Sequence, residues 1–309
     1  MSGRERSTLI AVVIPFIVFT AIWGSTWIVI RDQLGTVPAQ WSVAYRFAIA
    51  AIAMGLLSLA RGERLTLDRN GIKAAAVIGV SQFVINFNGV YIAERFITSG
   101  LVATVFALLL IPNTLLAWAM LGQKPSGRFL LWSVPSIAGV LLLFVHELRE
   151  HPAELQRIAL GIAFTLAGIM GASFANVFQA QDWVRRHSLF PMLAWAMAIG
   201  AACDALLALV IAGPPVVEAR IGYWIGLLYL ALAASALAFS LYFPVVRRIG
   251  PARAAYSSVT VPLIAMSFST WLEDYRWTPL TIAGVTLALG GMVGALSSGR
   301  PRAPAPDAG

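Results

Sequence analysis

Long apolar runs follow one another along almost the whole chain, separated by short polar or charged stretches. A helix needs about 20 mostly apolar residues to cross a hydrocarbon core of roughly 30 Å, which is the length of these runs. Continuous runs indicate helices, whereas membrane β-barrels show segments of roughly ten residues with alternating polarity. We therefore predict an all-α integral membrane protein with ten transmembrane helices: Leu9–Ile30, Trp41–Ala60, Ile72–Ala93, Thr98–Leu121, Phe129–Val145, Ile158–Gln179, Phe190–Ala212, Tyr223–Phe243, Ala252–Leu272 and Leu280–Leu296.

Short motifs recur in the same order in the two halves of this series. The matches are IWGSTW at Ile22–Trp27 with IMGASF at Ile169–Phe174, Pro112 with Pro262 150 residues further on, and IAG at Ile137–Gly139 with IAG at Ile282–Gly284. Each match alone is weak, because two hydrophobic stretches often match by chance. Their common order favours a duplication of a five-helix unit.

The duplication defines the expected domain organisation. Residues 1–147 form one five-helix repeat, residues 158–297 form the second, and residues 298–309 are expected to be a disordered cytoplasmic tail. Because five is an odd number of crossings, the second repeat enters the membrane from the opposite side. Inverted repeats are typical of secondary transporters, which bind substrate near the midplane between the repeats and work by alternating access.

Composition and charge agree with this interpretation. Apolar residues make up 59% of the 309 residues, charged residues make up 12%, and the mean hydropathy is +0.80, so an ordinary soluble domain is excluded. If the N-terminus is cytoplasmic, 15 of the 22 Lys and Arg residues fall on the inner side and six on the outer side. This bias follows the positive-inside rule, so the net charge of +8 does not require a nucleic-acid-binding function. We expect an inner (plasma) membrane protein with both termini in the cytoplasm.

Several of these features resemble a known family. The segment WGSTWIVIRDQLGTVPAQWSVAYRFAIAAI, the prolines Pro112 and Pro262 and the doubled five-helix unit look like the ten-span EamA-type exporters of the drug/metabolite transporter superfamily. The resemblance covers nearly the whole chain and implies an exporter whose size and layout are similar to those of the amino-acid exporter branch, including the aromatic amino-acid exporters. The family often has a Glu just after span four, where this chain has Gln123, whereas Glu273 keeps the acid in the second half.

Polar and aromatic side chains within the apolar runs are the candidate substrate path. Polar groups in hydrocarbon are costly unless they are paired, so the stripes that they form should point into the bundle. Hydrogen bonds that merely hold the helices together are the alternative explanation. The candidates for the path are Trp23, Thr26, Trp27, Arg46, Gln82, Asn86, Asn88, Tyr91, Asn176, Gln179, Tyr256 and Thr260.

Charges and prolines inside the spans suggest further roles. Arg46 and Asp204 occupy corresponding helices of the two halves, and ionisable residues within a membrane are by default functional hypotheses. Arg46 lies near the outer end of its span, where snorkelling to the interface is the alternative, and Asp204 is a candidate coupling residue or a hydrogen-bonded structural carboxylate. Pro112 and Pro262 remove backbone donors and are candidate hinges.

These observations predict a transporter and not an enzyme. One cysteine and three histidines near span ends supply neither a metal cluster nor a catalytic set, no nucleotide-binding motif is present, and no cofactor is expected. The first span has no acid, whereas the small multidrug pumps of the superfamily that this chain resembles carry a membrane-embedded Glu there. The resemblance therefore argues against a pump for lipophilic cations and favours export of amino acids or other small metabolites. Drug efflux and metabolite import are the alternatives within this fold, and a channel is the rival class. The expected partners are a small-molecule substrate and the lipid bilayer, with a monomer or homodimer in the membrane.

Overall fold

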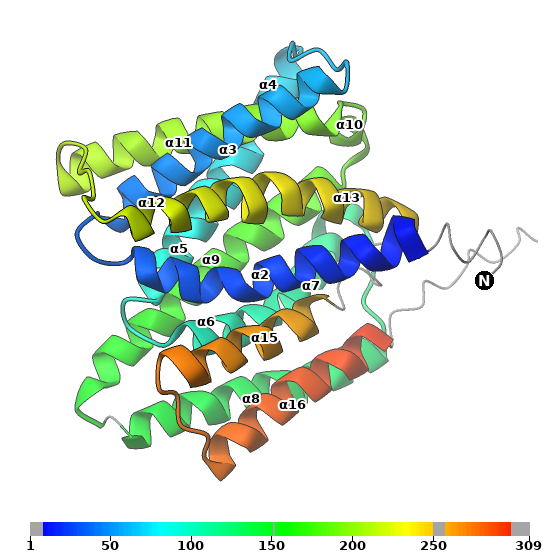
Figure 1. Cartoon of the computed structure of the whole chain (residues 1–309). Helices are drawn as coiled ribbons and strands as arrows, with labels where there is room; N and C mark the ends of the chain where they lie inside the picture. The colour runs from blue at the N-terminus through cyan, green and yellow to red at the C-terminus, as the bar shows by residue number, and fades with distance from the viewer. Residues whose placement is uncertain (1–8, 151, 250–256, 298–309) are drawn as a thin grey trace, which may run out of the picture.

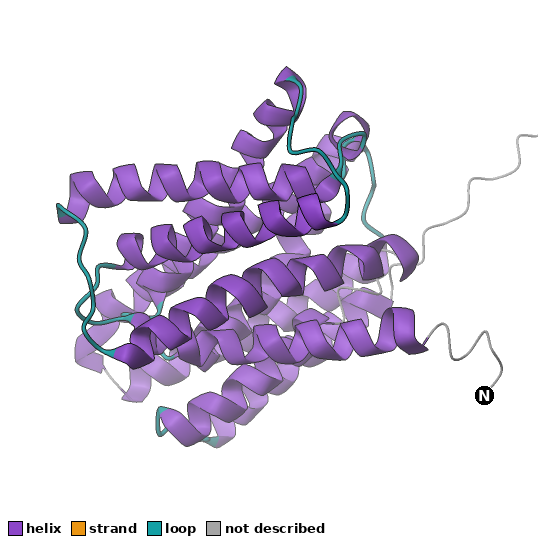
Figure 2. Ribbon diagram, turned by 45° about the horizontal axis from the view of Figure 1, so that its top comes forward, coloured by secondary structure: helices purple, strands orange, loops and turns teal. Residues whose placement is uncertain are grey.

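The computed structural model describes residues 9–150, 152–249 and 257–297, and within these ranges all regular structure is helical (Figures 1 and 2). The α-helices are α2 (Ile14–Gln33), α3 (Ala39–Ala60), α4 (Arg69–Ile78), α5 (Phe87–Ala93), α6 (Ser99–Phe106), α7 (Leu110–Leu121), α8 (Gly127–Glu150), α9 (Leu155–Gln179), α10 (Asp182–Arg185), α11 (Leu189–Ala212), α12 (Ile221–Leu228), α13 (Ala238–Ile249), α15 (Ser257–Leu272) and α16 (Pro279–Ser297). Segments of π- or 3₁₀-helix adjoin them: η1 (Leu9–Val13), η2 (Gly79–Asn86), η3 (Ala107–Leu109), η4 (Pro152–Glu154) and η5 (Tyr229–Leu237).

The described helices confirm the predicted membrane architecture. Nine of them, some built from consecutive segments, are long and apolar enough to cross a membrane, and α15 is a shorter apolar helix of 16 residues. The predicted boundaries are mostly within three residues of the observed ones. Two helices continue further: α8 ends at Glu150, beyond the predicted Val145, and α13 ends at Ile249, beyond the predicted Phe243. Polar residues at a membrane surface continue a helix readily, so the hydrophobic runs understate the lengths of these helices.

The described ends of the chain lie at the same end of the bundle. In Figure 1, α2 begins and α16 finishes on the right, and the long helices run roughly side by side between the two ends. The loops in Figure 2 are confined to the ends of these helices. This arrangement is the one expected from an even number of crossings. The N-terminal eight residues and residues 298–309, predicted to be the disordered tail, lie outside the described residues.

Corresponding helices of the two halves share a distortion that the hydrophobic pattern did not reveal. The third helix of the first half contains the π-helical segment η2, and the third helix of the second half contains η5. The segments begin at Gly79 and Tyr229, 150 residues apart, which is also the spacing of Pro112 and Pro262. A π-helical turn holds an extra residue and rotates the side chains that follow it, and such turns are frequent at functional sites.

Helices α8 and α16, the last of each half, lie side by side along their length (Figure 1). The glycines of the two IAG motifs meet there: a Cβ added to Gly139 would lie 2.5 Å from the carbonyl oxygen of Gly284. Small residues let two helix backbones approach closely in a membrane. In the GxxxG motif of α16, by contrast, Gly294 packs on Trp132 of the same chain, whereas Gly290 meets nothing within 4 Å.

Candidate substrate pocket

A cavity of about 200 Å³ lies inside the bundle, between helices of both halves. One water needs only roughly 10–15 Å³ of such space, so the cavity is large enough for a small organic molecule. Its lining mixes aromatic rings with amides, hydroxyls and one guanidinium: Trp23, Thr26, Trp27, Ile30, Arg46, Gln82, Asn86, Phe87, Val90, Ala103, Phe106, Ala107, Leu109, Leu110, Asn113, Ala172, Asn176, Phe239, Tyr242, Ser257, Ser258, Val261 and Pro262.

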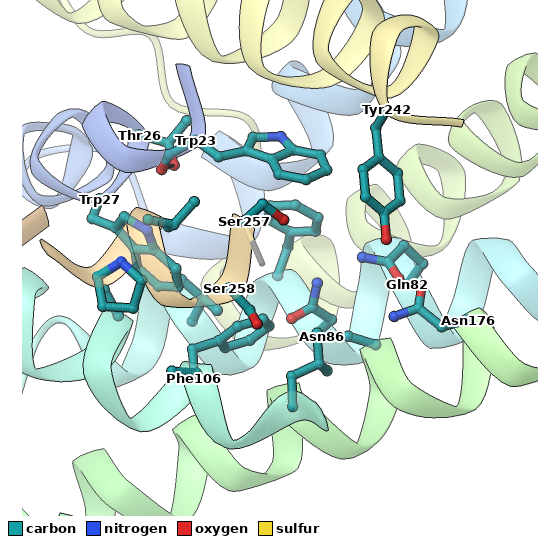
Figure 3. Close-up of a pocket in the computed structure, with 18 of the residues that line it drawn as sticks. Trp23, Thr26, Trp27, Gln82, Asn86, Phe106, Asn176, Tyr242, Ser257 and Ser258 are labelled. Atoms are coloured by element: carbon teal, nitrogen blue, oxygen red, sulfur yellow. Dashed lines mark hydrogen bonds between the residues drawn. The ribbon is translucent and has the colours of Figure 1, made fainter. Parts of the chain in front are cut away.

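One face of α2 forms a wall of the pocket. Trp23, Thr26, Trp27 and Ile30 are spaced at helical intervals and all line it. The indole N–H of Trp23 donates to the carbonyl oxygen of Ala234 on η5 at 3.1 Å, which fixes that ring against the other half. The Trp27 ring packs at 5.5 Å from the Phe106 ring, centroid to centroid. These contacts give the pocket a rigid aromatic wall, with both indoles visible in Figure 3.

Amide side chains from three helices converge on the same cavity. Gln82 and Asn86 come from η2, Asn176 from α9 and Asn113 from α7. In Figure 3, Gln82 and Asn176 lie close together next to the hydroxyl end of Tyr242, and Asn86 lies between them and Ser258. The Asn86 side chain is only 3% exposed, and its Oδ1 has no hydrogen-bond partner within the described residues. Unpaired buried acceptors are costly, so they mark a place where a ligand can bind.

Arg46 of α3 brings a positive charge to the pocket. Its side chain is 2% exposed, so it does not snorkel to the membrane surface. The Nε donates to Ser235 Oγ at 3.1 Å, and the guanidinium carbon lies 4.5 Å from the centroid of the Phe87 ring. The Nη1 has no hydrogen-bond partner in the described part of the protein.

Other predicted path residues lie outside the lining. Asn88 is turned toward α11, where its Nδ2 donates to Asp204 Oδ1 at 2.6 Å. Tyr91 is fully buried but not in the lining, Gln179 is the last residue of α9, and Thr260 is exposed on α15. Thr260 points away from the cavity because successive side chains on a helix differ in direction by about 100°, and the next two residues, Val261 and Pro262, face the cavity.

Three further predicted residues have distinct positions. Tyr256 lies outside the described residues. Asp204 is completely buried, apart from the pocket, with Oδ2 unpartnered among the described residues. Of the two candidate hinges, Pro262 lines the cavity within α15, and Pro112 follows the 3₁₀ segment η3 that interrupts its helix.

The structure adds residues that sequence reasoning missed. Phe106, Asn113, Tyr242, Ser257 and Ser258 also line the pocket. Asn113 carried a usable signal, since it is a lone amide in an apolar helix next to Pro112. The others are common residue types in membrane helices, and only the packing of the two halves brings them to one cavity.

The end of the bundle opposite the described termini is held by polar contacts. Glu273, just after α15, accepts from the Ser99 backbone N–H at 3.2 Å and from Ser99 Oγ at 2.6 Å, which caps the first turn of α6. A carboxylate at a helix N-terminus is favourable because it meets unpaired N–H groups and the positive end of the helix dipole. Arg31 Nε of α2 lies 3.6 Å from the same carboxylate. Glu273 thereby joins α2, α6 and α15.

Glu94 lies beside this junction, one residue beyond the third span. Its side chain is fully buried, and neither carboxyl oxygen has a hydrogen-bond partner within the described residues. Burial, reinforced by the negative charge of Glu273, raises the pKa of Glu94 well above its usual range, and Arg31 and Arg46 oppose this only in part. Glu94 was not among the predicted site residues, and it directly follows an apolar run in the sequence.

Within the described residues, no group of three or more His, Cys, Asp and Glu side chains is arranged to hold a metal ion. The pocket lining offers aromatic surface, amides, hydroxyls and one guanidinium for recognition of a ligand. A mostly apolar cavity with a few convergent polar groups is the usual form of a small-molecule site.

Comparison with known proteins agrees with this architecture. A solved crystal structure is similar in fold, with a TM-score of 0.66 at 16% identity, over 91% of this chain and 95% of that one. An uncharacterized transporter of Bacillus subtilis, YoaV, is 21% identical over 89% of this chain and 92% of its own length. The uncharacterized inner membrane transporter YedA of Escherichia coli is 27% identical over 81% of this chain and 79% of its own length. A probable amino-acid metabolite efflux pump of Escherichia coli is 23% identical over 88% of this chain and 90% of its own length.

The sequence also matches a family description twice, once in each half. The EamA-like transporter family matches residues 10–145 and again residues 159–297. The two matches together span most of the chain and cover the helices that surround the pocket. The chain therefore belongs to the EamA-like transporter family and is a multi-pass membrane transporter.

Proposed function

We propose that this chain exports neutral amino acids, aromatic ones included, or related small metabolites across the inner (plasma) membrane by alternating access. The observation that carries the proposal is the pocket lining, in which indole and phenyl rings stand beside amides and hydroxyls. Such a site gives an apolar side chain a surface to pack on and gives polar groups hydrogen-bond partners. The similarity to a probable amino-acid metabolite efflux pump supports the same substrate class.

Drug efflux is the second candidate, and the lining disfavours it for cationic drugs. A lipophilic cation is best held by aromatic rings together with a carboxylate, whereas none of the lining residues is Asp or Glu and one is Arg. Neutral drugs remain compatible with the lining, and a neutral drug as competitor of amino-acid uptake in liposomes would show whether they bind.

For the transport cycle, we propose that the repeats at residues 1–147 and 158–297 rock against each other around the pocket. The lining residues Asn176, Tyr242 and Ser257 lie near the ends of α9, α13 and α15 on the side of the described termini. With cytoplasmic termini, this side is the cytoplasmic one, and Glu273 and Ser99 hold the outer end closed. Substrate would then enter from the cytoplasm and leave after the contacts of Glu273 break. Pro112 and Pro262 are the proposed pivots.

Asp204 is our proposed coupling residue. It is fully buried, and among the described residues its side chain accepts a hydrogen bond from the Asn88 amide at 2.6 Å. A buried carboxylate with one unpaired oxygen can take up a proton more easily than it can remain charged. If it couples transport to protons, Asp204→Asn should abolish stimulation by a pH gradient while substrate counterflow persists. If Asp204→Asn keeps both the stimulation by a pH gradient and the counterflow, Asp204 is a structural residue.

The experiment that tests the proposed function uses the full chain in liposomes. Uptake of radiolabelled tryptophan, phenylalanine, alanine, glutamate and a lipophilic cation is followed with and without a pH gradient and a counterflow substrate. Saturable amino-acid flux with counterflow is the expected result. Flux of the cation alone would assign drug efflux, and non-saturable flux without counterflow would indicate a channel. Comparison of inside-out with right-side-out protein would distinguish export from import.

A further inference from the structure

Arg46 is a buried cation whose charge is not balanced by a close acid. Among the described residues it forms no ion pair: its Nε donates to the Ser235 hydroxyl at 3.1 Å, and the rings of Phe87 and Phe47 lie 4.5 and 5.3 Å from the guanidinium carbon. The Tyr91 hydroxyl also interacts with the guanidinium. Aromatic faces favour a cation, but they leave its N–H groups without acceptors. The unpartnered Nη1 belongs to a residue that lines the cavity. A buried charge of this kind is normally paired, so an acceptor is missing from the site.

The other charged or titratable groups near Arg46 do not fill this role. Tyr91 and Tyr229 interact with it, but a phenol hydroxyl is not the anionic partner that a buried cation requires. Glu94 also interacts with it, but not within ion-pair distance. The raised pKa of Glu94, caused by burial and by Glu273, favours its uncharged form. The positive charge of Arg46 is therefore available to a ligand in the cavity.

The same cavity holds acceptors that also lack partners. Asn86 Oδ1 and Asn113 Oδ1 are both buried and make no hydrogen bond within the described residues. One charged donor and two amide acceptors in a single cavity are complementary to a molecule that has both a carboxylate and an ammonium group. The aromatic wall of Trp23 and Trp27 is then left for the apolar part of that molecule.

We propose that Arg46 binds the carboxylate of the transported molecule, and that Asn86 and Asn113 accept hydrogen bonds from its ammonium group. The inference rests on the proposed transport of amino acids or related metabolites and adds which chemical group of the substrate is recognised. A guanidinium offers paired N–H donors that match the two oxygens of a carboxylate. Since the lining contains a single cation, the site favours a monoanionic group over a dianionic phosphate.

The test is direct ligand binding to the purified full chain, followed by the fluorescence of the pocket tryptophans. The probes are phenylalanine, 3-phenylpropionate, which keeps the carboxylate and lacks the ammonium, and phenylalaninamide, which keeps the ammonium and lacks the carboxylate. We expect 3-phenylpropionate to bind and phenylalaninamide to bind more weakly than phenylalanine by on the order of tenfold or more, since the hydrogen bonds to a charged group are lost.

Variants assign the preference to Arg46. Arg46→Gln should remove the discrimination between 3-phenylpropionate and phenylalaninamide. Arg46→Lys should retain it at lower affinity, because lysine keeps the positive charge but lacks the paired N–H donors of a guanidinium. Arg220→Gln is the matched control, because Arg220 is half-exposed at a surface pair with Asp32 and should leave the discrimination unchanged. A monodisperse elution profile of each variant shows that it folds.

The outcomes separate this inference from the proposed function. If the wild-type protein binds acid and amide equally, or if Arg46→Gln keeps the discrimination, the carboxylate site is wrong, even when amino acids are transported. If 3-phenylpropionate binds through Arg46 but no amino acid is transported in liposomes, the carboxylate site stands and amino-acid export is wrong. If none of the three probes binds, the inference is overturned.

Discussion

Replacing Gly139 by alanine tests whether the close contact of α8 and α16 contributes to stability. The added Cβ would collide with the backbone nitrogen of Ala288 and would lie 2.5 Å from the Gly284 carbonyl oxygen and 2.8 Å from the Ala288 Cα. All three atoms belong to the backbone, so no side chain can rotate away. Carbon atoms pack best at about 3.5–4.0 Å, so the helices must separate by roughly 1 Å at this point.

The expected cost follows from that separation. Overpacking a tight contact costs about 1–3 kcal/mol, and a gap of about 1 Å along the interface forfeits up to roughly half of each dispersion contact there. Alanine is a better helix former than glycine by about 1 kcal/mol, which opposes the loss. We expect Gly139→Ala to lower the free energy of unfolding by about 1–2 kcal/mol. Gly290→Ala on α16, where nothing lies within 4 Å, should be neutral or stabilising.

Unfolding in mixed micelles would be followed by the reaction of Cys203, the single cysteine, with a thiol dye. Cys203 is partly buried in α11, so its reactivity should increase when the bundle opens. The reasoning fails if Gly139→Ala is as stable as Gly290→Ala. That result would mean that the helices already stand far enough apart to accept a methyl group.

Other predictions address the end of the bundle opposite the described termini and the candidate hinges. The pKa of Glu94 is raised in the folded protein, so its contribution to stability is present below the usual pKa of a glutamate and is lost as pH rises toward the raised value. Unfolding midpoints of the wild-type protein should therefore fall from pH 5 to pH 8, and those of Glu94→Gln should fall less. Parallel pH curves for the two proteins would contradict this. Glu273→Gln should lower the free energy of unfolding by about 0.5–2 kcal/mol, because it weakens the cap of α6, and should speed hydrogen exchange at the Ser99 amide. Unchanged exchange at that amide would show that the carboxylate does not hold α6. Pro112→Ala and Pro262→Ala should both slow transport, and Pro112→Ala should do so without loss of binding because Pro112 does not line the pocket. Normal transport rates in both variants would remove both prolines as pivots.

The sequence by itself determined the helical architecture of this protein, its doubled unit and one face of its pocket. The apolar runs set where the helices lie, because a membrane helix must match the thickness of the hydrocarbon core. The recurring Pro112 and Pro262 indicated the doubled five-helix unit, and the family matches fall separately on the two halves. The α2 face with Trp23 and Trp27 was recognisable because side chains three and four residues apart share one side of a helix.

The tertiary structure decided what those side chains meet. Helical spacing places Asn86 and Asn88 on different sides of their helix, but only the packing of the helices decides that Asn86 lines the pocket and that Asn88 bonds Asp204. The burial of Arg46 and Glu94 likewise depends on partners more than 100 residues away, Ser235 and Glu273. Periodicity is a local property that a single helix expresses, whereas a pocket and its charge balance arise only when helices from both halves pack together.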